Sequence, residues 1–154
     1  MPALKDKPKT RRLTYGMDKV IVSDDVLISV LYMSNCQKFT MDTPTIHSAL
    51  YDASEMKKYE KLFENILFRK KDWFPFSEQI DSAFNNFFFN NFLKWYELDH
   101  DGYYVTKKMR GYYEKSEKQK MKPYKQQISD LVGFLDNKKF FLIRADSAEE
   151  WKEL

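Results

Sequence analysis

The stretch from Pro75 to Tyr113 constrains the fold of this chain more than any other part of the sequence. Ser77 is a suitable N-cap for a helix, and apolar residues then recur at the i, i+3, i+4, i+7 and i+8 positions of one helical face. These apolar residues are Ile80, Ala83, Phe84, Phe87 and Phe88. Asn91 would fall in the middle of the apolar stripe, where an unpaired carboxamide is costly. We therefore expect the helix to end at about Asn90, with Asn91 in the left-handed C′ conformation.

A β-hairpin and another helix are expected after this helix. Phe92 to Leu98 is predicted as the first strand, and Tyr103 to Val105 as the second. The turn between them is placed at Asp99 to Gly102, where Asp-Gly supplies positive φ. Thr106 then caps a helix that runs into a lysine-rich segment at 115–122.

Two helices are expected before Pro75. Ser23 is the predicted N-cap of the first, which has two aspartates in its first turn and extends to about Cys36. Thr43 is the predicted N-cap of the second, with Pro44 as its first helical residue. This second helix either runs on or restarts after a kink, and a connector at 68–76 follows it.

The end of the chain predicts further structure. Pro123 is expected to start a helix, Phe140 to Ile143 a strand, and Ser147 a small acidic helix that ends at Trp151 or beyond. The fold class is therefore α+β and mostly helical. The predicted parts are a basic flexible arm at 1–18, a domain at 19–122, and a C-terminal extension at 123–154 that is a candidate oligomerisation element.

This pattern resembles the winged-helix superfamily, in the form found in small bacterial and archaeal proteins. Phe74-Pro75-Phe76-Ser77 is similar to the aromatic-Gly-Pro-aromatic-Ser entry to the third helix, without the Gly. Ser77 to Leu93 follows the helix–Gly–strand pattern with Asn91 in the place of the glycine. Asp101 to Lys108 looks like the wing-to-helix segment, with Met109 where a Gly is common. The resemblance covers about residues 23–115 and implies a winged-helix core, with three helices and a β-hairpin wing, within 19–122.

The resemblance also implies a function. In winged helices that bind DNA, the third helix enters the major groove, where Asn and Gln can pair with adenine. The residues expected to face the bases are Gln79, Ser82, Asn86 and Asn90. The implied protein is a transcriptional regulator that binds double-stranded DNA as a homodimer.

The basic residues lie outside this third helix. No Lys or Arg occurs between Lys71 and Lys94. The net charge is 6 − 2 = +4 over residues 1–19, 8 − 2 = +6 over residues 107–125, and 1 − 4 = −3 over the last nine residues. Phosphate contacts are therefore expected from the arm, the connector and the late helix. The candidates are Arg11, Arg12, Arg69, Lys70, Lys71, Lys107, Lys108 and Arg110. The alternative is that the arm is a disordered tail and 107–125 a solvated face.

Phe89 lies about 180° from Ile80, on the helix face that should be polar. Either another segment or a symmetry mate covers it, or it contacts a partner directly. The second hypothesis is accordingly a non-catalytic protein–protein interaction module on the same scaffold. The expected interface residues are Phe89, Leu131, Leu135 and Trp151.

The sequence shows no recognisable catalytic or metal-binding motif. Cys36 is the single cysteine, and His47 and His100 are isolated from it and from each other. His47 is expected at the surface or half-buried, and the turn around His100 cannot easily wrap a metal ion. We therefore predict a non-enzyme with no cofactor and no metal. No run of about 18 apolar residues and no secretory signal occurs, so we expect no membrane contact and a cytoplasmic location.

Overall fold

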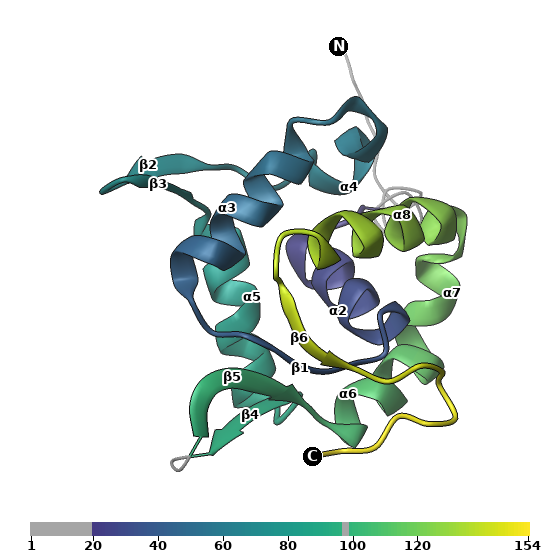
Figure 1. Cartoon of the computed structure of the whole chain (residues 1–154). Helices are drawn as coiled ribbons and strands as arrows, with labels where there is room; N and C mark the ends of the chain where they lie inside the picture. The colour runs from purple at the N-terminus through teal and green to yellow at the C-terminus, as the bar shows by residue number, and fades with distance from the viewer. Residues whose placement is uncertain (1–19, 97–98) are drawn as a thin grey trace.

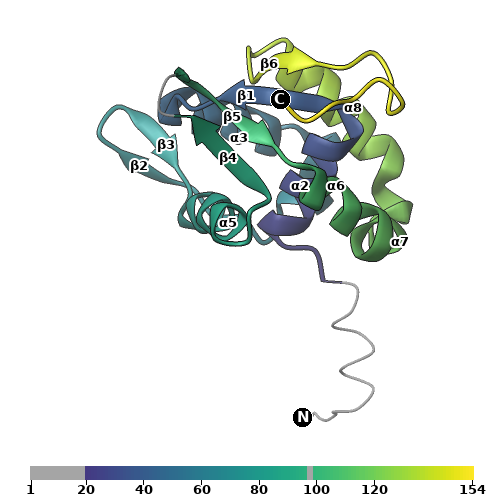
Figure 2. The same cartoon turned by 90° about the horizontal axis from the view of Figure 1, so that it is seen from below.

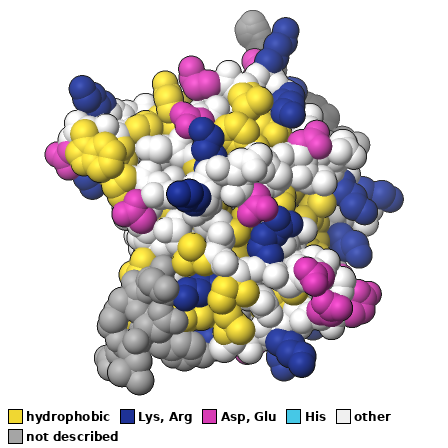
Figure 3. All heavy atoms as spheres, viewed as in Figure 1, with side chains coloured by type: hydrophobic (Ala, Val, Ile, Leu, Met, Phe, Trp, Pro, Cys, Tyr) yellow, Lys and Arg dark blue, Asp and Glu magenta, His cyan; other side chains and the backbone are white. Residues whose placement is uncertain are grey.

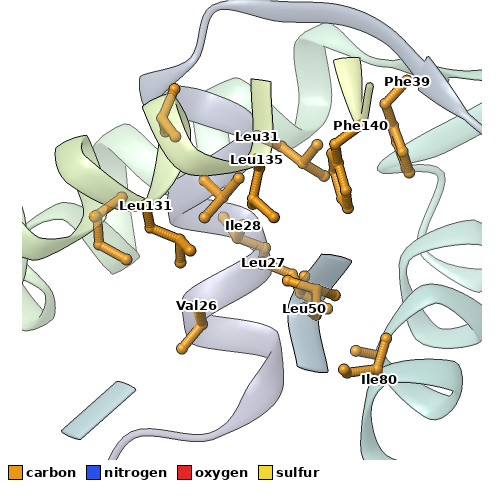
Figure 4. Close-up of a cluster of buried hydrophobic side chains, with 14 of the residues drawn as sticks. Val26, Leu27, Ile28, Leu31, Phe39, Leu50, Ile80, Leu131, Leu135 and Phe140 are labelled. Atoms are coloured by element: carbon orange, nitrogen blue, oxygen red, sulfur yellow. The ribbon is translucent and has the colours of Figure 1, made fainter. Parts of the chain in front are cut away.

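Helix α2 (Ser23–Met33) lies at the centre of the fold (Figure 1). The computed structural model describes residues 20–96 and 99–154. Every residue of α2 from Asp25 to Leu31 is buried, as is typical of a helix surrounded by other elements. It packs between α5 (Glu78–Phe89) and α8 (Lys125–Asp136). In Figure 4 the side chains of Ile28 and Leu31 lie beside Leu135 of α8. The predicted α+β, largely helical fold class is confirmed.

Four antiparallel strands form one sheet in the order β4 (Leu93–Tyr96), β5 (Asp99–Val105), β1 (Cys36–Thr40), β6 (Phe141–Arg144). The prediction that the first helix continues to Cys36 is wrong. Asn35 adopts the left-handed conformation (φ 54°) and turns the chain out of α2 into β1. The strand expected at Phe140 to Ile143 is present as β6.

The predicted turn at Asp99 to Gly102 is also wrong, because these residues begin β5. Asp99 pairs with Tyr96, and residues 97 and 98, predicted to end the first strand, lie outside the described residues. Gly102 pairs with Thr40, and a Cβ at Gly102 would lie 2.8 Å from the Phe39 carbonyl oxygen. The glycine therefore permits close pairing of β5 with β1.

Helix α3 (Thr43–Ser54) is followed by the short helices η1 (Lys57–Tyr59) and α4 (Glu60–Phe63), so the second helix restarts as one of the two predicted alternatives. The expected connector is a hairpin, β2 (Arg69–Lys71) paired with β3 (Phe74–Phe76), which projects from the body in Figure 1. Asp72 at its turn has a φ of 55°.

Helix α5 confirms the sequence prediction at both ends. The Ser77 side chain accepts a hydrogen bond from Ile80 N at the start. At the other end Asn91 is left-handed (φ 62°), its N–H donates to Phe88 O at 3.1 Å, and Phe92 N donates to Phe87 O at 2.7 Å. These two hydrogen bonds and the Phe87–Phe92 ring contact form a Schellman motif.

The other expected caps are partly displaced. Thr106 caps α6 (Lys107–Tyr112) as predicted, accepting from Met109 N. Helix α2 instead has Val22 as its N-cap, with Ser23 as its first residue, and Asp42 rather than Thr43 caps α3. In both cases an aspartate accepts a hydrogen bond from a backbone N–H at the start of the helix. Asp25 accepts from Val22 N, and Asp42 accepts from Thr45 N.

After α6 the chain forms a π-helical turn, η2 (Tyr113–Glu117), and two short helices, α7 (Lys118–Lys120) and η3 (Lys122–Tyr124), before α8. The predicted extension at 123–154 is part of the main core, to which α8 contributes Leu131 and Leu135 at 0% exposure. The small helix predicted from Ser147 is absent, since the segment forms a turn in which Glu150 N donates to Ser147 O. The predicted arm at 1–18 lies outside the described residues.

Candidate functional site

Three of the four residues expected to face DNA bases lie on the exposed face of α5. Ser82, Asn86 and Asn90 are exposed. The Asn86 side chain hydrogen-bonds the Asp24 carboxyl group, and Asn90 Nδ2 donates to Asn86 O at 2.9 Å. The side chains of both asparagines therefore hydrogen-bond within the protein, although both residues are exposed.

Gln79 has a different role from the predicted one. Its Oε1 accepts hydrogen bonds from Leu67 N and from Ser77 Oγ, both at 3.1 Å. Its backbone carbonyl accepts from Ser23 Oγ at 3.1 Å. Gln79 thus joins the start of α5 to α2 and to the loop before β2, and we correct its assignment from base contact to structural contact.

The exposed face of α5 is acidic and carries one large apolar side chain. Helix α5 contains Glu78 and Asp81, and neither Lys nor Arg. Glu78 pairs with Arg69 at 2.7 Å, but both side chains are more than half exposed, so the pair adds little stability. Phe89 is 90% exposed, so no described segment covers it; a symmetry mate and direct contact with a partner are the predicted alternatives that the described residues leave open.

The β2–β3 hairpin forms a second exposed surface, next to the start of α5. Arg69, Lys70 and Lys71 are all exposed, and Trp73 at the turn is 74% exposed. The Arg69 guanidinium and the Lys71 ammonium lie 5.2 and 4.3 Å from the centre of the Phe76 ring. At this end of the molecule, on the left of Figure 3, hydrophobic side chains lie among Lys, Arg, Asp and Glu side chains.

A cleft of about 450 Å³ separates this hairpin from α3. Its walls are Ser48, Tyr51, Asp52, Phe68, Arg69, Lys70, Trp73, Phe74 and Pro75. The cleft is therefore largely aromatic with cations from β2 at one side, which suits an extended segment that carries an apolar anchor.

The expected phosphate contacts do not form one surface. Lys107 and Lys108 are exposed on α6, at the opposite end of the molecule from the β2–β3 hairpin in Figures 1 and 2. Arg11 and Arg12 lie outside the described residues.

Arg110, also expected to contact phosphate, is only 8% exposed. Its guanidinium lies between the rings of Tyr32 and Trp151, 4.3 and 4.7 Å from their centres, and donates to Tyr32 O at 3.4 Å. Trp151 Nε1 in turn donates to Cys36 O at 2.8 Å. Arg110 and Trp151 therefore hold the C-terminal segment against the body, and Arg110 is not the surface cation that was predicted to contact phosphate.

The predicted interface residues Leu131 and Leu135 are likewise fully buried, packed within the core against α2, and only Phe89 of that set is strongly exposed. His47, expected at or near the surface, is 2% exposed. Its Nδ1 accepts from Ser77 N at 3.1 Å, and its ring stacks on Phe76, while burial lowers its pKa.

A larger cavity, of about 610 Å³, lies where the first turn of α2, the last turn of α5, and α6 with η2 come together. Its lining includes Ile28, Phe87 and Phe92 as apolar residues, and Asn86, Asn90, Lys108, Tyr112 and Lys115 as polar ones. Gly111 and three acidic residues, Asp24, Asp25 and Glu117, complete it.

These carboxyl groups interact closely. Asp25 Oδ2 accepts from Val22 N and from Lys120 Nζ, both at 2.9 Å, and the Glu117 side chain hydrogen-bonds Asp25. Glu117 is 4% exposed, and its Oε2 has no partner. Burial, together with the neighbouring Asp25, raises the pKa of Glu117 to about 8. The pKa of Asp25 is lowered by its hydrogen bonds, which outweigh its burial.

The sequence does not predict this cavity, because two aspartates in a first helical turn are explained by the helix dipole and Glu117 lies in the lysine-rich segment at 115–122. One feature of the sequence does indicate that Glu117 is buried. It lies four residues after Tyr113 and four before Met121, on the same helical face as these two buried side chains.

No family model, curated protein or solved structure matches this chain. Among the described residues, no group of three His, Cys, Asp or Glu side chains is placed to hold a metal ion. None of the described helices is long and apolar enough to cross a membrane.

Proposed function

We propose that this protein is a non-catalytic interaction module on a winged-helix scaffold and that its partner is a protein. The helices α2, α3 and α5, with the short η1 and α4 between α3 and α5, precede the β4–β5 hairpin, and β1 pairs with β5 beside that hairpin. This order and the left-handed Asn91 in the place of the glycine support the scaffold. The β2–β3 hairpin and β6 are additions to it. Because one scaffold serves many functions, the function is argued from the exposed surfaces.

The observation that carries the proposal is Phe89, 90% exposed on a helix face whose charged residues are carboxylates. Burying a phenylalanine side chain contributes about 1.5–3 kcal/mol, so this ring is a strong anchor for a protein surface. Carboxylates on the same face oppose binding to a polyanion. Leu67 and Trp73 are two further exposed apolar side chains, at 69% and 74% exposure, in the loop before β2 and at the turn of the β2–β3 hairpin.

Affinity capture with the tagged full chain tests this function, comparing wild type with Phe89→Asp. Leu142→Asp is the matched control, because Leu142 is 46% exposed on β6 and receives the same charge elsewhere. We expect Phe89→Asp to lose a protein that both wild type and Leu142→Asp retain. Sedimentation velocity over a range of concentrations shows whether that protein is a second copy of the chain, as the expected homodimer requires. If Phe89→Asp captures and self-associates like wild type, the proposal fails.

A second function, binding of double-stranded DNA as a regulator, is supported by the scaffold together with the basic β2–β3 hairpin. A two-stranded β-ribbon fits the major groove, and Arg69, Lys70 and Lys71 are exposed on β2. Ser82, Asn86 and Asn90 would then be the base-facing residues of α5.

Titration of a labelled duplex between 50 and 200 mM salt tests DNA binding, with an expected log–log slope of roughly −5 for about six phosphate contacts. Replacing Arg69, Lys70 and Lys71 with Gln should make that slope shallower by about 3. A triple Gln variant of Lys57, Lys58 and Lys61, exposed on η1 and α4, is the charge-matched control. Absence of binding at about 50 mM salt and tens of micromolar protein would exclude this function.

A further inference from the structure

The C-terminal segment, residues 145–154, packs on the body of the protein in the way that a peptide ligand does. It follows β6 and contains no helix or strand. In Figure 1 it runs from β6 to the region of α6, where the chain ends. Its residues are exposed or half-buried. The segment is therefore held by a small number of discrete contacts rather than by burial within the core.

Trp151 is the anchor of this segment. Its Nε1 donates to Cys36 O at 2.8 Å, and the centre of its ring lies 4.7 Å from the Arg110 guanidinium. The described partners of Arg110 are this ring, the Tyr32 ring and Tyr32 O, and none of them is a carboxylate. A cation that is buried without an anion depends on its aromatic neighbours. The position over Arg110 therefore selects an aromatic side chain.

The two residues after the anchor make polar contacts with β1, β4 and α6. The Lys152 carbonyl oxygen accepts from Gln37 Nε2 at 2.9 Å. Glu153 Oε2 lies 3.6 Å from Lys94 Nζ and accepts from Lys107 N at 3.3 Å. An aromatic anchor combined with a main-chain hydrogen bond and a nearby carboxylate gives both affinity and register, as in the recognition of short peptides.

The residues between β6 and the anchor are not fixed to the body in the same way. Within the described part of the chain, no hydrogen bond or ion pair joins residues 146–150 to an earlier residue. Glu150 N donates to Ser147, and Trp151 N donates to Ala148 O, both within the segment itself. A connector of this length spans up to about 18 Å when extended. Trp151 is thus an anchored end on a connector that can reach outside its own molecule.

We propose that the C-terminal segment is exchanged between molecules, so that the site on β1, β4 and α6 takes the segment of a second copy of this chain. The occupant is chosen by complementarity, because an identical segment makes the same contacts in either position. Exchange of an identical element is a low-cost route to a dimer. Within one chain the short connector holds the segment at a local concentration on the order of millimolar. The resident segment is therefore the competitor that an incoming one displaces.

Anisotropy of a labelled peptide with the sequence of residues 145–154 tests whether the site accepts this segment from outside. Full-length Trp151→Ala should bind the peptide at least about tenfold more tightly than wild type, because the apparent affinity scales with the fraction of open sites. Glu149→Ala is the matched control, since Glu149 is exposed in the same segment, and it should bind like wild type. A peptide that itself carries Trp151→Ala should bind at least about tenfold more weakly to the same open site.

Two results overturn the proposal in this assay. One is a peptide affinity of Trp151→Ala no higher than that of wild type, and the other is equal binding of the two peptides. Should Trp151→Ala fail to fold, Glu153→Gln weakens the resident segment at an exposed position. That variant should raise the peptide affinity about threefold, as expected from the loss of an exposed ion pair. An unchanged affinity in Glu153→Gln then has the same meaning.

Mixing two full-length variants tests exchange between molecules directly. Trp151→Ala keeps the site and loses the anchor, whereas Arg110→Ala keeps the anchor and loses the guanidinium beneath it. In sedimentation velocity the equimolar mixture should dimerise at least about tenfold more tightly than either variant alone, because one intact segment then meets one intact site. A mixture that associates no more strongly than its components overturns the exchange. If Arg110→Ala does not fold, the peptide titration decides.

The exchange is independent of the contact proposed at Phe89. Adding Phe89→Asp to both variants should leave the dimer of the mixture intact, because Phe89 lies on α5 and makes no described contact with residues 145–154. Failure of the exchange and failure of the proposed function are therefore distinguished by separate measurements. Loss of the mixed dimer on addition of Phe89→Asp would assign the association to α5 and overturn the exchange.

Discussion

The Glu117 carboxyl group should make the stability of this protein decrease as the pH rises. Burial and the nearby Asp25 raise the pKa of Glu117 from 4.5 to about 8 in the folded state. A raised pKa means that the folded state holds the proton more tightly than the unfolded chain does. The stabilisation from this proton is complete below pH 4.5 and is lost as the pH approaches 8.

The size of the effect follows from the shift. Each unit of pKa difference is worth about 1.4 kcal/mol, so between pH 5 and pH 8 the loss is at most about 4 kcal/mol. Glu117→Gln removes the titration and keeps a side chain of similar shape. We therefore expect the unfolding free energy of the variant, relative to wild type, to increase steadily over this range.

The difference between the two proteins isolates Glu117 from the other titrating groups. His47 has a lowered pKa, so below pH 6.5 it makes both proteins less stable as the pH falls, and its contribution cancels. Asp25 has a lowered pKa and Lys120 a raised one, so neither titrates between pH 5 and pH 8. Urea unfolding followed by tryptophan fluorescence at pH 5, 6, 7 and 8 gives the values. A wild-type to variant difference that stays constant within about 0.5 kcal/mol would refute the reasoning.

Three further predictions use the same urea assay. Arg110→Ala should lower the unfolding free energy by about 2 kcal/mol, because the packing of the guanidinium on two rings is lost. Lys108→Ala on the same helix is the control and should change the unfolding free energy by less than about 0.5 kcal/mol. Equal effects of the two variants would contradict the buried position of Arg110. Leu135→Ala should lower the unfolding free energy by about 2–5 kcal/mol, because Leu135 is 0% exposed beside α2. A decrease of less than about 1 kcal/mol would show that α8 is peripheral to the core. Asn91→Val should lower the unfolding free energy by at least about 1 kcal/mol and Asn91→Gly should leave it unchanged, because φ is 62° at this position. An unfolding free energy that Asn91→Val leaves unchanged would contradict the left-handed helix end.

The parts of the fold that the sequence predicted correctly depend on neighbours close along the chain. Ser77 and Thr106 each cap a helix through an N–H three residues away. Asn91 ends α5 through contacts with residues of the last helical turn. Such interactions are complete within a few residues, so residue type and spacing are sufficient to predict them.

The parts that were mispredicted depend on distant pairing. Cys36–Thr40 is a strand because β5 and β6 pair with it from far along the chain. Asp99 to Gly102 has turn-forming residues, but pairing of β5 with β1 and β4 draws these residues into a strand. Tertiary pairing of this kind overrides local propensity, and a single sequence does not reveal it.

The candidate site was hard to predict for a related reason, since residue type does not specify the partner of a side chain. Gln79 was expected to contact bases, but the backbone N–H of Leu67 takes its acceptor oxygen. Glu117 belongs to a run of lysines that suggests a solvated face, yet the π-helical turn and the packing of η2 on α2 bury it beside Asp25. Only the assembled fold brings these carboxyl groups together.

The contacts that cations make in the folded protein also bear on the choice between the two proposed functions. The gathering of basic residues in the N-terminal arm and the late helix at first favours DNA. In the folded protein, however, two of the predicted phosphate contacts are already engaged: Arg69 pairs with Glu78, and Arg110 is buried between the rings of Tyr32 and Trp151. Phosphate contacts formed by these two residues would have to displace existing interactions, which weakens the electrostatic attraction that dominates binding to DNA. The exposed ring of Phe89 has no such competition, and a protein surface that buries it gains the full apolar contribution.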